Sequence, residues 1–172
     1  MAEEIINRVA NSKLKTFDLE DFYVTGTRST IDISQWLLEG IVLVESRFRE
    51  SLKTTDFSIY KDHYVAIDCS TDAIIPQWAW MLVQSQLHGI AKKVVLGTQE
   101  QLETELYREV IVGVDLSEFR DVPVIVKGCS NKPVPIAAYA MITDRLQSVA
   151  KSIMYGEACS AVPVFKKKKQ LS

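Results

Sequence analysis

The sequence has few of the residues on which common metal and catalytic motifs depend. It contains two histidines and three cysteines among 172 residues, and it lacks both the HExxH pattern of zinc proteases and the GxSxG turn of hydrolases. The glycine-rich patterns that hold nucleotide phosphates, GxGxxG and GxxxxGK[ST], do not occur either. We therefore do not expect a metalloprotease, a triad hydrolase or a nucleotide-binding protein.

The sequence also lacks strong net charge and long apolar runs. A net charge of −2 gives no general attraction to nucleic acid or to an anionic membrane, so neither is an expected partner. No apolar run approaches the length of a membrane span, and the opening MAEEIINRV carries two acids and no secretory apolar core. We expect a cytoplasmic protein, in which three cysteines argue against a disulfide scaffold. The thiols are then buried small residues, metal ligands or reactive groups.

From residue 64 onward, short β-rich runs alternate with segments of helical length. The β-rich runs are YVAID, KKVVLG, VPVIVKG and KSIMYG, and the helical segments are PQWAWMLVQSQLHG, TQEQLETELYREVIVG and PIAAYAMITDRLQSVA. This alternation predicts an α/β fold with a mainly parallel sheet and flanking helices. A chain of this length, 47% hydrophobic, is sufficient for one sizeable core, so we expect residues 1–172 to form a single domain.

The two ends of the chain are less regular. Residues 1–62 include the strand-like TRSTIDI and the helix-like VESRFRESLKTT, which predict an N-terminal part added to the sheet at an edge or in antiparallel fashion. Residues 63–158 hold the repeated βα units. Residues 159–172 form a cysteine-containing segment with the basic tail FKKKKQLS, which we expect to be a solvated terminus.

Each cysteine is followed directly by serine. Two of these pairs lie in similar surroundings, because VAIDCSTDAIIPQWAWML and VIVKGCSNKPVPIAAYAM both run from a strand through Cys-Ser and a proline into an apolar helix. The similarity indicates an internal duplication, or only the preference of βα junctions for small residues and for a proline at the helix start.

The strand ends place the cysteines at a candidate metal site. In one parallel sheet, Cys69 and Cys129 would leave the same carboxyl edge, and Cys159 would follow the last strand on that side. Three thiolates suit an iron-sulfur cluster or zinc and leave one coordination position open. Asp72 and Glu157 are close to cysteines in the sequence and are the candidate fourth ligands.

Two other interpretations of the cysteines stay open. Cysteine often packs as a small buried residue at crowded βα turns, which would make this a metal-free interaction protein with structural cysteines. Alternatively, the start of the following helix lowers the thiol pKa of Cys129, which would then act as the nucleophile or persulfide carrier of a thiol-dependent enzyme.

Along its full length the chain resembles an uncharacterised bacterial family of unknown function. The similar segments are EIINRVANSKLKTFDLEDFY, YVAIDCSTDAIIPQWAWMLV, VIVKGCSNKPVPIAAY and KSIMYGEACSAVPVFKK. Members of that family resemble passengers of gene clusters for iron-sulfur assembly. The resemblance implies an accessory role in cluster assembly, with iron-sulfur assembly proteins as partners, and it carries over no catalytic residue.

Overall fold

The computed structural model describes residues 13–128 and 131–168. The chain divides into two compact units. Unit 2 is Val24–Leu106, and unit 1 combines the chain up to Tyr23 with the chain from Tyr107 onward, so unit 2 is an insertion in the sequence of unit 1. Each unit has its own sheet, whereas the sequence suggested one. The α/β class is confirmed, and the single-domain expectation stays a prediction.

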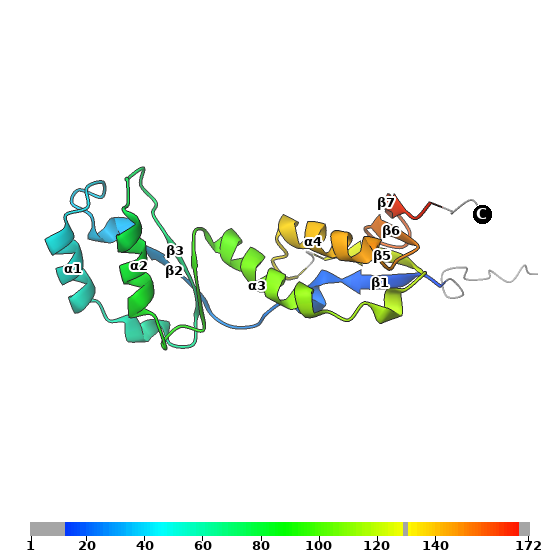
Figure 1. Ribbon diagram of the computed structural model, residues 1–172, viewed down its shortest axis with the longest axis horizontal. Helices are drawn as coiled ribbons and strands as arrows, with labels where there is room; N and C mark the ends of the chain where they lie inside the picture. Colours follow the sequence, from blue (N-terminus) through cyan, green and yellow to red (C-terminus); the bar gives the residue numbers. More distant parts are fainter. Residues whose placement is uncertain (1–12, 129–130, 169–172) are drawn as a thin grey trace, which may run out of the picture. The chain divides into compact units, whose positions relative to one another are not determined.

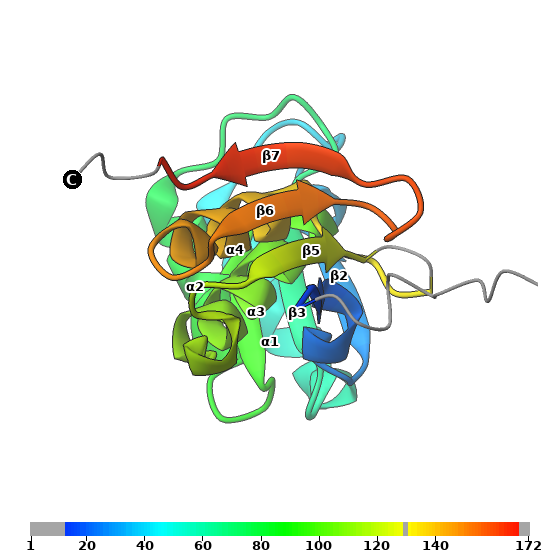
Figure 2. The ribbon, with the colours of Figure 1, turned by 90° about the vertical axis from the view of Figure 1, so that its right-hand side faces the viewer.

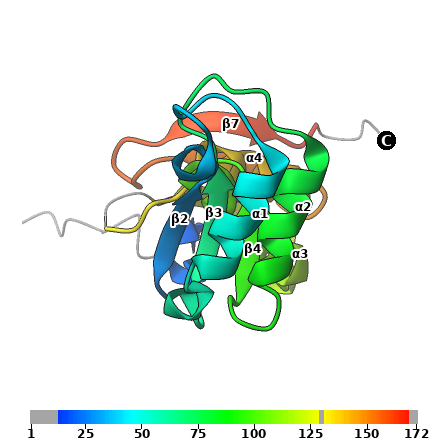
Figure 3. The same ribbon diagram turned by 90° about the vertical axis from the view of Figure 1, so that its left-hand side faces the viewer.

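Unit 2 is a parallel three-stranded sheet with two helices on one face (Figures 1 and 3). The strand order is β2-β3-β4, with α1 between β2 and β3 and α2 between β3 and β4. The bounds are β2 Arg28–Asp32, α1 Glu45–Thr54, β3 Tyr64–Asp68, α2 Gln77–Gln86 and β4 Lys93–Leu96. All of the strand pairs are parallel, as the alternating pattern predicts.

The central strand β3 of unit 2 is buried on both faces. Phe48 of α1 and Val83 of α2 share one apolar cluster with Val65. On the other face Ala66 packs with Leu102 of α3 (Gln99–Gly113). This double burial explains why YVAID is a continuous apolar run. A capping box starts α3, because the backbone N–H of Thr98 donates to Gln101 Oε1 at 2.7 Å and the N–H of Gln101 donates to Thr98 Oγ1 at 3.3 Å.

Unit 1 contains a four-stranded sheet in the order β1-β5-β6-β7. Figure 2 shows β5, β6 and β7 side by side. The first three strands are parallel, and β7 is antiparallel to β6. The bounds are β1 Lys15–Asp18, β5 Pro123–Lys127, α4 Ile136–Gln147, β6 Ser152–Tyr155 and β7 Val162–Lys166. Phe17, Val124 and Ile142 belong to one core cluster, which joins the sheet to α4.

The two units repeat one arrangement of backbone. In unit 2 the N–H of Gly97 donates to the carbonyl of Ile67, and in unit 1 the N–H of Gly156 donates to the carbonyl of Val126. The turns that lead into the strands also match. The backbone N–H of Asp62 donates to the carbonyl of Ile90 in unit 2, and that of Asp121 donates to the carbonyl of Val149 in unit 1. Both aspartates have positive φ. The matched bonds lie at both ends of β3 and β5, so the similarity extends beyond the Cys-Ser junctions.

The ends of the chain differ in part from the expectation. The N-terminal strands β1 and β2 are edge strands, as one alternative predicted, and both pair in parallel. The antiparallel pair lies instead near the C-terminus, where β7 includes residues that we assigned to the tail. Its Pro163 and Lys166 obscure the strand pattern, yet both residue types are common in edge strands. No helix in the described part of the chain is long and apolar enough to cross a membrane.

A buried ion pair links β2 to α3 within unit 2. Arg28 Nε lies 2.7 Å from Glu103 Oε1, Arg28 Nη2 lies 3.1 Å from Oε2, and the side chains are only 8% and 7% exposed. Arg28→Met should destabilise the protein by about 3 kcal/mol, because Glu103 would remain as a buried charge without this partner. Urea unfolding at pH 7 measures the loss.

The double variant Arg28→Met/Glu103→Leu is the matched control. It should be markedly more stable than Arg28→Met alone, because it removes both charges and leaves apolar side chains in their place. Single-variant losses that simply add in the double variant would contradict an energetic coupling between the two residues.

Candidate functional site

Cys69 is the first residue after β3 and belongs to unit 2. Its backbone N–H donates to Asp68 Oδ1 at 2.8 Å, and its Sγ donates to the carbonyl of Thr71 at 3.5 Å. The side chain is partly buried against the apolar cluster of unit 2. The thiol is thus held by its own loop, in the manner of a packed structural cysteine.

Asp72 lies exposed in the loop between β3 and α2. The N-cap residue of α2 is Pro76 and no side chain caps this helix, so Asp72 is not its cap. The role of Asp72 as a metal ligand stays a prediction.

Glu157 and Cys159 lie in the turn between β6 and β7 of unit 1, where both are exposed. Lys127 Nζ is 4.0 Å from Glu157 Oε1 and 3.2 Å from Asp18 Oδ2. The hydrogen bond and charge of Asp18, followed by the charge of Glu157, raise the pKa of Lys127. Glu157 therefore lies within ion-pair distance of Lys127.

Cys129 lies outside the described residues, and only its place in the sequence bears on the site. It follows β5 of the unit 1 sheet, whereas Cys69 follows β3 of the unit 2 sheet. The expectation that both leave one sheet along the same edge is wrong, because the two strands belong to different sheets. The repeat also shifts the Cys-Ser pairs by one residue: the counterpart of Cys69 is Gly128, and the counterpart of Cys129 is Ser70.

Within residues 13–128 and 131–168, no group of three or more His, Cys, Asp or Glu side chains is placed to hold a metal ion. The polar centre at the carboxyl end of the unit 2 sheet is built instead around Asp32. Its carboxylate accepts hydrogen bonds from the N–H of Ser34 at 2.9 Å, the N–H of Ser70 at 3.1 Å and the hydroxyl of Ser70 at 2.5 Å. This carboxylate joins the end of β2 to the loop after β3.

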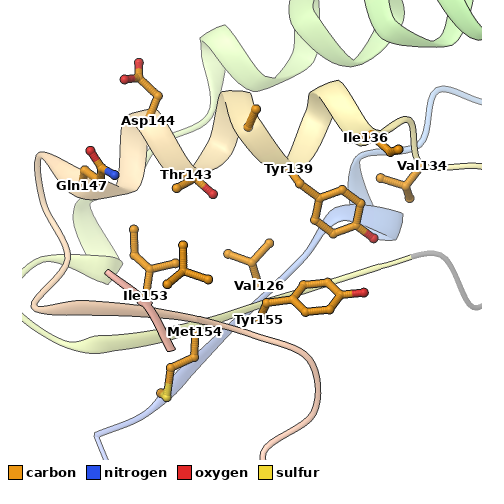
Figure 4. A pocket seen from close by; sticks show the side chains of 12 residues that line it. Val126, Val134, Ile136, Tyr139, Thr143, Asp144, Gln147, Ile153, Met154 and Tyr155 are labelled. Carbon is orange, nitrogen blue, oxygen red and sulfur yellow. The ribbon is translucent and has the colours of Figure 1, made fainter. Parts of the chain in front are cut away.

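A pocket lies in unit 1, between α4 and the strands β6 and β7 (Figure 4). It has a volume of about 700 Å³, within the range of small-molecule pockets. Its apolar lining comes from Val126, Val134, Ile136, Ile153, Met154 and Val164. Figure 4 shows Tyr139 and Tyr155 at one end and Gln147 at the other. The two tyrosine rings meet edge to face, with centroids 5.8 Å apart.

Sequence reasoning missed this pocket. The residues on α4 follow helical spacing at Ile136, Tyr139, Ala140 and Thr143, a stripe that also describes ordinary core packing. The wall opposite α4 includes Val164 of β7. The sequence analysis did not predict this strand, because it overlaps the basic tail. A comparison of the two repeats could have indicated the pocket, because α4 has the small residue Ala140 at the position where α2 has Met81.

The hydrogen bonds of Asp32 make unit 2 sensitive to acid. Burial alone raises the pKa of Asp32, but hydrogen bonds from Ser70 and Ser34 outweigh it and lower the pKa from 3.8 to about 2. A lowered folded-state pKa contributes stability above pH 3.8, and that contribution is lost as the pH falls toward 2. Asp32→Asn should therefore cost about 1 kcal/mol at pH 7 and progressively less between pH 4 and 2.

Chemical unfolding of the wild type and Asp32→Asn across this pH range measures the difference, with Asp72→Asn as the exposed control. A cost for Asp32→Asn that stays constant down to pH 2 would show that the carboxylate charge does not contribute.

Comparisons with known proteins place the chain in a family. Neither the curated proteins nor the solved structures include a match to it. The model of a family described as a protein of unknown function, DUF2480, matches residues 3–167, nearly the whole chain. The full-length resemblance seen in the sequence is thereby confirmed, and the protein belongs to the DUF2480 family.

Proposed function

We propose that this protein binds a small apolar molecule in the pocket between α4, β6 and β7 of unit 1. The observation that carries the proposal is the 700 Å³ apolar hollow with polar side chains at its ends. Ligand pockets of this size combine a mostly apolar lining with a few polar groups that orient the ligand. Single exposed apolar residues are ordinary on protein surfaces, but a pocket of this size that is lined mostly by apolar side chains is uncommon and indicates a binding site.

The comparison between the two repeats supports a pocket that is specific to unit 1. The fifth residue of α4 is Ala140, where α2 has Met81, and the eighth is Thr143, where α2 has Gln84. Strand β6 is followed by β7, whereas β4 is followed directly by α3. In unit 1 the shared backbone arrangement therefore has an additional strand, β7, beside the pocket and smaller side chains on the helix.

Replacing two pocket residues of α4 by their counterparts in α2 should close the pocket. The variant Ala140→Met/Thr143→Gln places two longer side chains along the pocket, and α2 shows that a helix of this frame accepts them. We expect it to bind the neutral dye N-phenyl-1-naphthylamine at least about tenfold more weakly than the wild type, a loss of about 1.4 kcal/mol. Dye fluorescence during titration measures the affinity.

The reciprocal variant Met81→Ala/Gln84→Thr in unit 2 is the matched control and should bind the dye as the wild type does. Thermal unfolding of each variant checks that the fold is retained. Equal dye affinity in the wild type and in Ala140→Met/Thr143→Gln would overturn the proposed pocket.

A thiolate-bound metal or iron-sulfur cluster, with an accessory role in cluster assembly in the cytoplasm, is our second proposal. The observation that favours it lies in unit 1: Lys127 precedes Cys129 by two residues and reaches Glu157, two residues before Cys159. This contact links the turn of Cys159 to the end of β5. The other candidate ligands from the sequence are Cys69 and the oxygen donors Asp72 and Glu157. Thiol catalysis at Cys129 without a permanent metal uses the same region.

Anaerobic purification followed by iron, zinc and sulfide analysis tests the second proposal. We expect Cys129→Ser and Cys159→Ser each to lose most of the bound metal, because serine offers a harder donor than thiolate. Cys69→Ser tests whether unit 2 contributes, and Asp72→Ala with Glu157→Ala tests the fourth position. Wild-type protein that binds no metal would end the proposal, and selective alkylation of Cys129 would then favour thiol chemistry.

A further inference from the structure

We infer that the unit 1 pocket selects an uncharged, elongated apolar molecule carrying one hydroxyl or carbonyl group, which Tyr155 binds. This inference rests on the proposed pocket and adds the chemical class of its ligand. Three properties of the pocket carry it: the charges of its lining, the engagement of the nearest lysine, and the distribution of its polar groups.

The lining disfavours an anionic ligand. Among the described residues that form the pocket, Asp144 is the charged one, and none is lysine or arginine. Figure 4 shows the Asp144 carboxylate directed away from the apolar hollow. A ligand carboxylate or phosphate placed inside would lose its hydration without gaining a cationic partner, and such burial is costly. An apolar molecule with an uncharged head does not incur this cost.

Lys127 does not supply the missing cation. It follows the lining residue Val126, but consecutive side chains of a strand point to opposite faces. Its ammonium group is engaged with Asp18 at 3.2 Å and with Glu157 at 4.0 Å. These carboxylates also raise the pKa of Lys127 and hold its charge at the carboxyl end of the sheet.

Polar groups lie at both ends of the pocket, and Thr143 of α4 lies between them. Figure 4 places the phenol groups of Tyr139 and Tyr155 together at one end and the amide of Gln147 at the other, with Val126 and Ile153 between. Tyr155 is 47% exposed, so its hydroxyl is accessible to a ligand head group at the opening of the pocket. A phenol hydroxyl both donates and accepts, which suits an alcohol or a carbonyl oxygen. The apolar wall formed by Val126 and Ile153 suits the body of the ligand.

Three compounds with the same ten-carbon chain separate the possible head groups at pH 8: 1-decanol below its solubility limit, and decanoate and decylammonium below their micelle concentrations. Each competes with N-phenyl-1-naphthylamine for the full-length protein. We expect 1-decanol to displace the dye at concentrations at least about tenfold lower than decanoate does, because the carboxylate has no cation to meet. Decylammonium should also compete more weakly than the alcohol.

Tyr155→Phe tests the hydroxyl without removing the ring. It should weaken 1-decanol by roughly threefold to tenfold, in line with the loss of one hydrogen bond, and weaken the dye, which carries no hydroxyl or carbonyl group, by less than that. Tyr60→Phe, in unit 2, is the control and should change neither.

The outcomes distinguish this inference from the proposed function. If decanoate or decylammonium competes as well as 1-decanol while Ala140→Met/Thr143→Gln still abolishes dye binding, the pocket stands and the neutral-ligand inference fails. If Tyr155→Phe leaves 1-decanol unaffected, Tyr155 is not the head-group residue and the inference fails in that part. If the wild type does not bind the dye, the proposed pocket itself is overturned.

Discussion

Unit 1 depends on the parallel pairing of β1 with β5. The register aligns Lys15 with Val124 and Asp18 with Lys127, so two segments separated by the whole of unit 2 form one sheet. Buried contacts stabilise this closure: Phe17 and Leu19 lie in the core of unit 1, and the hydroxyl of Tyr107 donates to the carbonyl of Leu19 at 3.1 Å. Closing so long a loop costs chain entropy, but that cost grows only slowly with loop length. A few well-packed residues at the start of the chain are therefore sufficient to complete the sheet.

The repeat of one arrangement in two units shows how a common frame acquires different surfaces. Backbone bonds at the sheet ends are kept, as at Gly97 and Gly156, because they fix the chain where a strand gives way to a loop. Side chains that point away from the shared core are free to differ, as Met81 and Ala140 do. Such positions contribute little to the stability of the frame, so function can change there without loss of the fold.

The cysteines illustrate the limit of arguments from sequence motifs. Their Cys-Ser pairs look alike, but the repeat aligns Cys69 with Gly128 and separates the pairs by one position. The hydrogen bonds instead assign the polar centre of unit 2 to Asp32 and its serine partners, residues without a recognised motif.

The sequence by itself determined the elements that depend on local chemistry. The strand YVAID and the apolar helices after Pro76 and Pro135 form where they were predicted, because the hydrophobic period and proline act over a few residues. Tertiary structure alone decided which strands share a sheet, that β7 pairs with β6 despite Pro163, and that Val126, Tyr139 and Val164 line one pocket. These outcomes depend on contacts between residues far apart in the chain, whose partners no local pattern of a single sequence specifies.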